Sequence, residues 1–425
     1  MNATDIKIKE LARACKVASR ATARLTTAQK NQALHEMAAA LMANEKTIVS
    51  ENAKDVKHAR TKQLSSAMID RLVLNHDRLT KMADALREIA MLPDPVGEIS
   101  DIRTRPSEIQ VGMMRIPLGV IAMIYESRPN VTSDAAGLCL KSGNAVLLRG
   151  GSEAFHSNTA ITAALHQAME KVGIPATAIT LVPTTDRAIM NEMLTLDESI
   201  DLVIPRGGEG LIRFVVENSR IPVIKHYKGV CHQYVDKSAN FDKAINLLVD
   251  GKTSRPGVCN ALETLLVHKD IAAEFLPKAA EYMNKLDVEL RGCEKTCKIL
   301  PNIVRTTNDD YATEYLELII AVRVVDDYEM AVSHIQEFGS DHTEVIVTED
   351  LETAQKFLRD VNSSVVTVNA SSRFSDGGEL GLGAEIGIST TKLHAFGPMG
   401  LESLTTRKFI VVGKGEVRHP QSKVI

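Results

Sequence analysis

Short apolar runs alternate with helical segments through most of this chain, and that alternation constrains the fold more than any other feature. The runs are rich in Val, Ile and Leu, and they stand at residues 120–125, 145–148, 179–182, 200–204, 222–224, 319–325, 344–347 and 364–368, with a further run ending at 267. Helical periodicity separates them at residues 133–140, 155–172, 209–218, 242–249, 271–285, 328–337 and 351–359. Buried strands joined through helices are typical of parallel sheets covered on both faces. The sequence therefore predicts an α/β fold with two parallel-sheet domains.

Two stretches depart from this alternation. Residues 4–92 carry apolar side chains at steps of three and four, which predicts helix up to the prolines at 93 and 95. Residues 97–116 alternate apolar and polar side chains, which predicts a β-hairpin. Because this alternation exceeds what one domain face needs, we interpret the hairpin as an arm that reaches another subunit.

Composition excludes several classes of protein. The 425 residues are 44% hydrophobic and carry a net charge of -4, enough for ample cores. Scattered basic residues, 4% aromatics and no Trp argue against a nucleic-acid partner. No run approaches the roughly 18 apolar residues of a membrane span, and the start lacks a signal-type segment. We expect a cytoplasmic protein without membrane or nucleic-acid partners.

Six cysteines are scattered through the chain without a framework of spacings. This scatter predicts reduced thiols rather than disulfides. Cys293 and Cys297 form a lone C-x3-C pair with no second pair or nearby histidine, so we expect no metal site there or elsewhere.

Cys259 is the candidate nucleophile. It ends a tight turn that contains Pro256 and Gly257 and precedes an apolar strand. Such a turn displays a thiol on a rigid element, where it can attack a carbonyl carbon and carry the acyl group as a thioester. A small buried hydrophobe at the start of a strand remains the alternative.

Gly207 and Gly208 are candidates for phosphate binding. They follow a predicted strand directly and open a predicted helix. Backbone N–H groups at such a helix N-terminus can hold a pyrophosphate. A plain turn between strand and helix is the alternative.

Four motifs in the same order resemble those of the γ-glutamyl phosphate reductase family, which belongs to the aldehyde dehydrogenase superfamily. They read RPGVCNA (255–261), YESRPNVT (125–132), GSDHTE (339–344) and LGAEIG (382–387). The likeness runs nearly end to end. It implies an aldehyde dehydrogenase-like fold in which one α/β domain binds NAD(P), a second carries the cysteine, and a small β arm joins subunits.

The resemblance also implies how the chain is divided. The NADP-binding domain takes residues 1–96, 117–235 and 379–404. The catalytic cysteine domain takes residues 236–378, and residues 97–116 and 405–425 form the oligomerisation arm.

Catalytic roles follow by position in these motifs. Cys259 matches the family nucleophile, and Asn130 matches the side-chain amide of the oxyanion hole; a turn residue after Pro129 is the alternative for Asn130. Hydrolytic relatives carry a water-activating glutamate where this chain reads HYKGVC (226–231), without a carboxylate. That absence suits a thioester that is reduced by hydride rather than cleaved by water.

Substrate and cofactor contacts are also implied. Arg128 and Arg255 flank the catalytic motifs and are candidates for the substrate's carboxylate and phosphate, with structural ion pairs as the alternative. Glu317 matches the carboxylate that contacts the nicotinamide ribose, although a solvated charge is the alternative. Arg149 and Ser152 stand where NAD-preferring relatives place a lysine and a glutamate, which favours NADPH, although Glu153 nearby could restore an acidic contact.

We therefore expect NADPH-dependent reduction of L-glutamyl 5-phosphate to L-glutamate 5-semialdehyde, the second step of proline biosynthesis. A homo-oligomer is expected, and glutamate 5-kinase is a candidate partner. The alternatives are an NAD-linked aldehyde dehydrogenase that makes a free acid, disfavoured by the missing glutamate, and a scaffold protein without activity.

Overall fold

The structure is a computed structural model that describes residues 7–418. It divides into two compact units. The first holds the chain up to Ile224, Leu382–Gly387 and the chain from Met399, and the second holds Lys225–Gly381 and Ile388–Pro398. Residues 1–6 and 419–425 of the predicted domain and arm lie outside the described residues.

A four-stranded parallel sheet forms the centre of the first unit. Its strand order is β5-β4-β3-β6, and its members are β3 (Val120–Tyr125), β4 (Ala145–Gly150), β5 (Ile179–Leu181) and β6 (Leu202–Arg206). All side chains of β3 are buried, as a strand covered on both faces requires. The predicted strand at 222–224 is wrong: only Val223 forms a bridge, to Val203.

Nine helices of the first unit surround this sheet within the described residues. They are α1 (Ile8–Thr22), α2 (Thr27–Ala43), α3 (Glu45–Thr61), α4 (Ser66–Leu72), α5 (His76–Met91), α6 (Asn130–Lys141), α7 (Phe155–Lys171), α8 (Arg187–Met193) and α9 (Glu209–Asn218). Helices α1 and α6 contact the strands, while α2 packs on α5, α6 and α7. The stretch before residue 93 that the sequence predicted as helical thus consists of five separate helices. Side-chain caps mark the breaks between them: at the start of α2, for example, the Thr26 side chain accepts from the Gln29 N–H.

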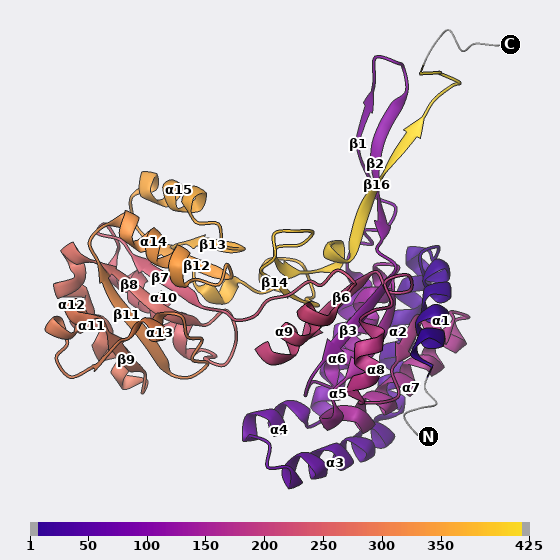
Figure 1. The fold of residues 1–425 in the computed structure, drawn as a ribbon, viewed down its shortest axis with the longest axis horizontal. Coiled ribbons are helices and arrows are strands. Elements are labelled where there is room, and N and C mark those ends of the chain that lie inside the picture. Colours follow the sequence, from indigo (N-terminus) through magenta and orange to yellow (C-terminus); the bar gives the residue numbers. More distant parts are fainter. Residues whose placement is uncertain (1–6, 419–425) are drawn as a thin grey trace. The chain divides into compact units, whose positions relative to one another are not determined.

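The predicted hairpin is confirmed. Strands β1 (Ile99–Thr104) and β2 (Gln110–Pro117) pair antiparallel, and β16 (Thr405–Val412) pairs antiparallel with the other edge of β2. Figure 1 shows these three strands as a separate sheet. The side chains of Ile102, Phe409 and Val411 are more than half exposed on it.

A seven-stranded parallel sheet forms the second unit. Its order is β10-β9-β11-β8-β7-β12-β13. The strands are β7 (Cys231–Val235), β8 (Leu262–His268), β9 (Glu289–Gly292), β10 (Val304–Arg305), β11 (Ile319–Val325), β12 (Thr343–Val347) and β13 (Val365–Val368). Because β7 pairs with both β8 and β12, this unit starts before the boundary drawn at 235/236 from the sequence.

Helices cover both faces of the second sheet. They are α10 (Phe241–Thr253), α11 (Lys269–Lys285), α12 (Glu294–Ile299), α13 (Asn308–Tyr311), α14 (Tyr328–Phe338) and α15 (Leu351–Asp360). Alternate residues of one strand enter different cores: Leu265 and Val267 pack with α10 and α11, whereas Leu266 packs with α14 and α15. This alternation is what a pleated strand buried on both faces produces.

The segment between β13 and β16 contributes to both units. It contains the short paired strands β14 (Gly387–Ser389) and β15 (Gly397–Met399). The sequence predicted that residues 379–404 belong to the first domain. Residues 388–398 group with the second unit instead, so that prediction holds only in part. No helix within residues 7–418 is long and apolar enough to cross a membrane.

Candidate active site

Cys259 lies in the turn that joins α10 to β8, and its side chain is half-buried. The neighbouring residue fixes this turn. Asn260 Nδ2 donates to the Ser375 carbonyl at 3.0 Å, and its own carbonyl accepts from the Ser372 hydroxyl at 2.7 Å. The half-buried cysteine therefore lies on a backbone whose next residue is hydrogen-bonded at both its side chain and its carbonyl.

A short strap at residues 225–230 packs directly against the cysteine turn. A Cβ on Gly229 would lie 1.9 Å from the Cys259 carbonyl oxygen, so only glycine fits. The Gly229 N–H donates to Glu314 Oε1 at 2.9 Å, and the Val230 N–H donates to Ser340 Oγ at 2.9 Å. The strap thus supports the backbone of the Cys259 turn.

This contact predicts a sharp effect of Gly229→Ala. Because the obstructing atoms belong to the Cys259 backbone, the methyl group must displace the turn, and we expect a loss of about 1–3 kcal/mol of stability together with most of the activity. Thermal unfolding and kcat measure the two effects. Gly257→Ala is the matched control for stability, because a Cβ there meets only the Leu316 carbonyl at 3.8 Å. An unfolding curve and kcat like those of the parent would contradict the contact.

Two histidines gather around the thiol. One ligand atom from each of His226, Cys259 and His342 lies within 4.8 Å of the others. His342 stands just before β12 and is fully buried. Burial, reinforced by repulsion from a charged His226, lowers the pKa of His342 to about 3, so its imidazole is neutral in ordinary buffers.

Three of the other five thiols are fully buried, whereas Cys293 and Cys297 are half-buried like Cys259. Burial raises the pKa of Cys15 to about 12, and it raises the pKa of Cys139 and Cys231 as well. The Cys231 thiol donates to the Cys259 carbonyl at 3.2 Å, which makes it a support for the turn. Cys293 is half-buried and accepts from the Thr296 N–H at the start of α12.

Asn130 is the first residue of α6, just after β3. The turn before it is strained, because Ser127 has φ +46°. Glu153 stabilises this turn: its carboxylate accepts from the Ser127 backbone N–H and, at 3.1 Å, from the Ser127 hydroxyl. Glu153 is therefore engaged with the YESRPN turn, while its side chain remains half-exposed.

The exposed Asn130 side chain is oriented by an acid. Its Nδ2 donates one hydrogen to Asp134 Oδ2 at 2.8 Å. Removal from water raises the pKa of Asp134 to about 6, although the Asn130 bond and the Arg206 guanidinium oppose that rise. Since an amide nitrogen carries two hydrogens, the second remains for another acceptor.

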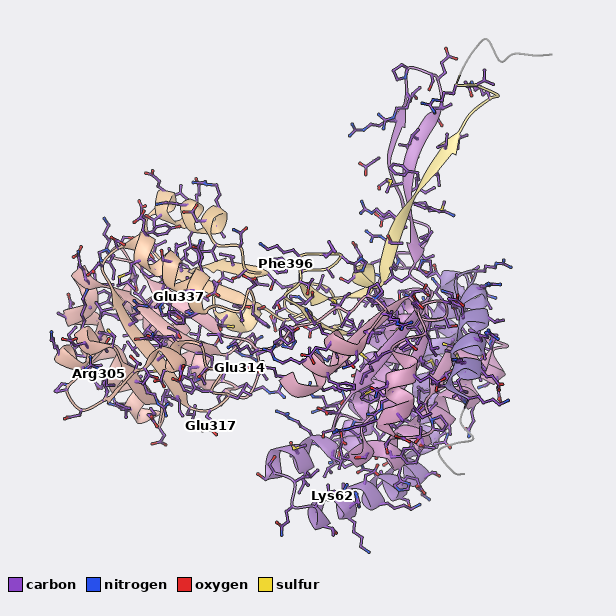
Figure 2. The ribbon with its side chains drawn as sticks, viewed as in Figure 1. Lys62, Arg305, Glu314, Glu317, Glu337 and Phe396 are labelled. Atoms are coloured by element: carbon purple, nitrogen blue, oxygen red, sulfur yellow. The ribbon has the colours of Figure 1, made fainter. Side chains whose placement is uncertain are left out.

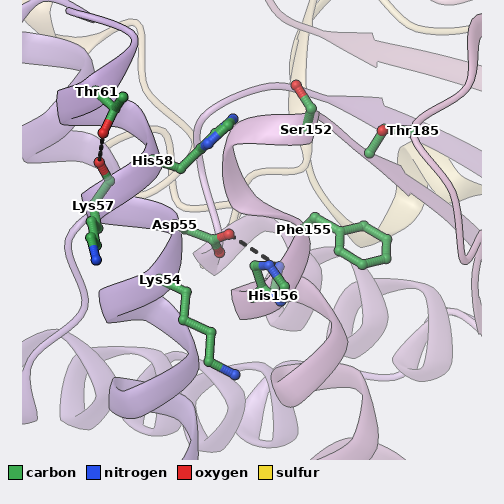
Figure 3. A pocket seen from close by; sticks show the side chains of 9 residues that line it. All are labelled: Lys54, Asp55, Lys57, His58, Thr61, Ser152, Phe155, His156 and Thr185. Atoms are coloured by element: carbon green, nitrogen blue, oxygen red, sulfur yellow. Dashed lines mark hydrogen bonds between the residues drawn. The ribbon is translucent and has the colours of Figure 1, made fainter.

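A cavity of about 480 Å³ in the first unit is the candidate cofactor site (Figure 3). Its lining includes Ser152 and Thr185 together with Lys54, Lys57 and His58 of α3. A second hollow of about 250 Å³ shares His58 and Ser152 with it. The Asp55 carboxylate also lines the cavity, and it accepts from the backbone N–H groups of His156 and Ser157. The cationic and hydroxyl side chains of this concave site suit a phosphorylated ribose.

Arg149 does not line this cavity. It is only 8% exposed, its Nη2 donates to the Thr185 carbonyl at 2.7 Å, and burial lowers its pKa. Its guanidinium thus positions the Thr185 segment of the cavity wall, which differs from the direct phosphate contact expected from the sequence.

Gly207 and Gly208 lie between β6 and α9, as expected. The Gly208 N–H donates to Glu126 Oε2 at 3.2 Å, and the same carboxylate lies where a Cβ on Gly207 would stand. A pyrophosphate at this helix N-terminus would have to replace that carboxylate.

The remaining residues that were predicted to contact substrate or cofactor differ in their exposure. Arg128 is half-buried within the strained turn, and Arg255 is exposed beside the cysteine turn. Figure 2 shows Glu314 and Glu317 on the segment before β11. Glu317 is exposed, whereas Glu314 is the carboxylate that reaches the Gly229 strap.

Several of these residues were missed by sequence reasoning. Lys54, Lys57 and His58 read only as the polar face of a helix, and His226 stands in a separate segment from Cys259. Glu314 lies three residues before Glu317. The sequence therefore indicated a functional carboxylate in this segment, but it did not show that Glu314, rather than Glu317, contacts the Gly229 strap.

Comparison with known proteins agrees with this architecture. The model of the aldehyde dehydrogenase family matches residues 1–315, so the chain belongs to the aldehyde dehydrogenase family. The γ-glutamyl phosphate reductase of Salinibacter ruber is 63% identical and covers 98% of this chain and 96% of that protein. That of Geotalea daltonii is 60% identical over 97% of this chain and 99% of its own length. The crystal structure of the Thermotoga maritima γ-glutamyl phosphate reductase superposes with a TM-score of 0.96 at 45% identity, covering 97% and 100% of the two chains. The resemblance and the fold class expected from the sequence are confirmed.

Proposed function

We propose that this chain reduces L-glutamyl 5-phosphate to L-glutamate 5-semialdehyde with NADPH and releases phosphate. The names of its relatives and the display of a single half-buried thiol on a clamped turn support this assignment. The product makes the reaction the second step of proline biosynthesis.

Cys259 performs the covalent step in this proposal. Its thiolate attacks the acyl carbon, the C–O bond to phosphate breaks, and a thioester forms on Sγ. NADPH, when bound, supplies the hydride that converts the thioester to a thiohemiacetal. Release of the aldehyde then returns Sγ as a thiolate, and one proton is taken up overall.

Other residues of the chain stabilise negative charge on the intermediates and on the substrate. The Asn130 amide donates to the oxyanion of each tetrahedral intermediate, which fits its exposed side chain and its unused hydrogen. Arg128 and Arg255 remain our candidates for the substrate's phosphate and α-carboxylate. Glu317 is retained only as a prediction for the nicotinamide ribose, since its side chain makes no contact that supports the role.

We place part of NADPH in the cavity of the first unit. Lys54, Lys57 and His58 line it and would supply positive charge for a 2′-phosphate once Lys54 leaves Glu51, with which it is paired at 2.6 Å, and Ser152 would face the ribose. Glu153 accepts from Ser127, and it also lines the smaller hollow that shares His58 and Ser152 with this cavity. The cationic lining supports NADPH over NADH, whereas the Glu153 carboxylate opposes that preference.

The observation that carries the reaction type is the set of side chains around Cys259. Within the described residues, two imidazoles and no carboxylate share its cluster, and Glu314 is bound to the Gly229 N–H. Without a carboxylate to activate water, phosphate should be the acyl acceptor in the reverse direction.

We therefore expect NADPH formation from the semialdehyde and NADP to depend on phosphate or its analogue arsenate. The assay follows absorbance at saturating semialdehyde while phosphate is varied, with sulfate at equal ionic strength as the control. Glutamate production at an undiminished rate in sulfate would instead establish a hydrolytic aldehyde dehydrogenase.

Cofactor choice gives a separate prediction. Replacing Lys54 and Lys57 together by alanine should raise the KM for NADPH about tenfold, since bonds to a charged phosphate are typically worth about 1.5–3 kcal/mol. The KM for NADH should change little. Lys46→Ala is the matched control, because Lys46 is on α3 but does not line the cavity. Equal effects on both cofactors would exclude a 2′-phosphate contact.

Homo-oligomerisation through the arm is part of the proposal. The exposed apolar side chains of β1 and β16, among them Ile102, Phe409 and Val411, support a protein partner for this sheet. No contact in the structure bears on glutamate 5-kinase, which stays a prediction.

A further inference from the structure

The cluster of His226, Cys259 and His342 has a composition that the reduction of an acyl phosphate does not require. A thioester mechanism needs the thiol, but it does not need two imidazoles with their ligand atoms within 4.8 Å of it and of each other. Open zinc sites hold the ion with three protein side chains drawn from imidazole, thiolate and carboxylate groups, and this cluster supplies three such ligands. We propose that this cluster binds a thiophilic divalent cation such as Zn²⁺, which blocks the nucleophile reversibly.

Hydrogen bonds define the tautomer of His342. The Thr343 hydroxyl donates to Ser375 Oγ at 2.8 Å, so its oxygen accepts from the His342 Nδ1–H, which lies 2.8 Å away. The lone pair is therefore on Nε2. That atom is buried and has no hydrogen-bond partner among the described residues. A ligating histidine is usually held this way, with its other nitrogen donating to a neighbouring oxygen.

The backbones that carry the ligands are fixed before any ion binds. The His342 carbonyl accepts from Ser364 Oγ at 2.6 Å and from the Val365 N–H at 3.0 Å. The strap that carries His226 packs on the Cys259 backbone through Gly229. Tetrahedral zinc needs its ligand atoms roughly 3.3–3.7 Å apart, so ligand atoms that lie up to 4.8 Å apart must close by up to about 1.5 Å.

The ligand chemistry selects the class of ion. A sulfur and two nitrogens suit Zn²⁺, whereas Mg²⁺ and Ca²⁺ require oxygen ligands. Binding converts the thiol to a metal-bound thiolate, and its proton goes to the buffer. Water takes the fourth position. With Sγ bound to the metal, its electron pair is no longer free to attack an acyl carbon.

The ion should be detected directly on the full-length protein without substrate or cofactor. After treatment with a chelator, Zn²⁺ is titrated in competition with a chromogenic chelator. We expect one equivalent per chain, with no displacement by Mg²⁺. Cys259→Ser, His226→Ala and His342→Gln should each weaken binding by roughly tenfold or more.

A matched control removes the competing thiol pair. Cys293→Ser/Cys297→Ser deletes two half-buried cysteines outside the cluster and should leave Zn²⁺ affinity unchanged. His226→Ala keeps the test valid if the buried His342 variant fails to fold. Binding lost in the double variant but kept in the cluster variants would overturn the proposal.

Alkylation gives a second readout. Zn²⁺ should slow the reaction of Cys259 with iodoacetamide, located by peptide mass mapping, and His226→Ala should lose this protection. Equal alkylation with and without Zn²⁺ would refute the site. Neither measurement uses turnover, so failure of the metal site and failure of the proposed reaction are distinguishable.

Discussion

Cys259→Ser should abolish turnover while the protein remains folded. A serine hydroxyl is almost entirely un-ionised near neutral pH, whereas a thiol is partly thiolate, so the variant loses the attacking group. The change is small in volume, and the turn is held by bonds of Asn260 and Gly229 that do not involve Sγ. We therefore expect an unchanged thermal unfolding curve and a rate at background.

The measurement is NADPH consumption with L-glutamyl 5-phosphate, alongside NADPH binding measured by fluorescence. Binding should persist, because Lys54, Lys57 and Ser152 of the candidate cofactor cavity belong to the other unit. Cys293→Ser is the control, since that thiol is also half-buried but caps α12. Turnover in purified Cys259→Ser, with contamination excluded, would end the thioester mechanism.

The sequence predicted the fold well where strands are long and apolar. β3 and β11 have the bounds expected from their Val and Ile runs, because a strand buried on both faces leaves a continuous apolar signal. β7 was missed: its residues Cys231–Val235 include His232 and Gln233, which are buried polar side chains. His232 is paired with Glu344 on the neighbouring strand, and no pattern of hydrophobicity can reveal such a pair.

The candidate site was predictable in part. Turn chemistry and motif pointed to Cys259 and Asn130, and the structure places the first on a clamped turn and the second at a helix start with a free hydrogen. The role of Arg149 was misjudged, because its position on β4 does not reveal that the guanidinium bonds to Thr185. Contacts made across separate segments, such as Cys259 with His342, emerge only once the sheet order is known.

Asn130→Ala should lower kcat by about 10²–10³, the usual cost of removing one oxyanion donor, equal to about 2.7–4 kcal/mol. KM for the substrate should change much less, because the oxyanion exists only in the tetrahedral states. Steady-state kinetics measure both. Asn218→Ala is the control, since that exposed amide only donates to the Phe214 carbonyl at the end of α9. A kcat within a few-fold of the parent would exclude Asn130 from the oxyanion hole.

The pH profile should reveal how Asn130 is oriented. An ionised Asp134 can only accept, so it holds the amide nitrogen toward itself and leaves the second hydrogen for the oxyanion. Asp134 has a pKa of about 6, and its protonated form can donate to the amide oxygen instead, which lets the amide flip. As the pH is lowered below about 6, activity should therefore decrease more steeply than titration of the thiol alone would produce. The charged groups near Asp134 are Arg206 and, 3.9 Å from the Arg206 guanidinium, Glu385. Asp134→Asn should lower kcat and remove the extra limb, because its amide neither ionises nor selects one orientation. An identical limb in that variant would assign the titration to another group.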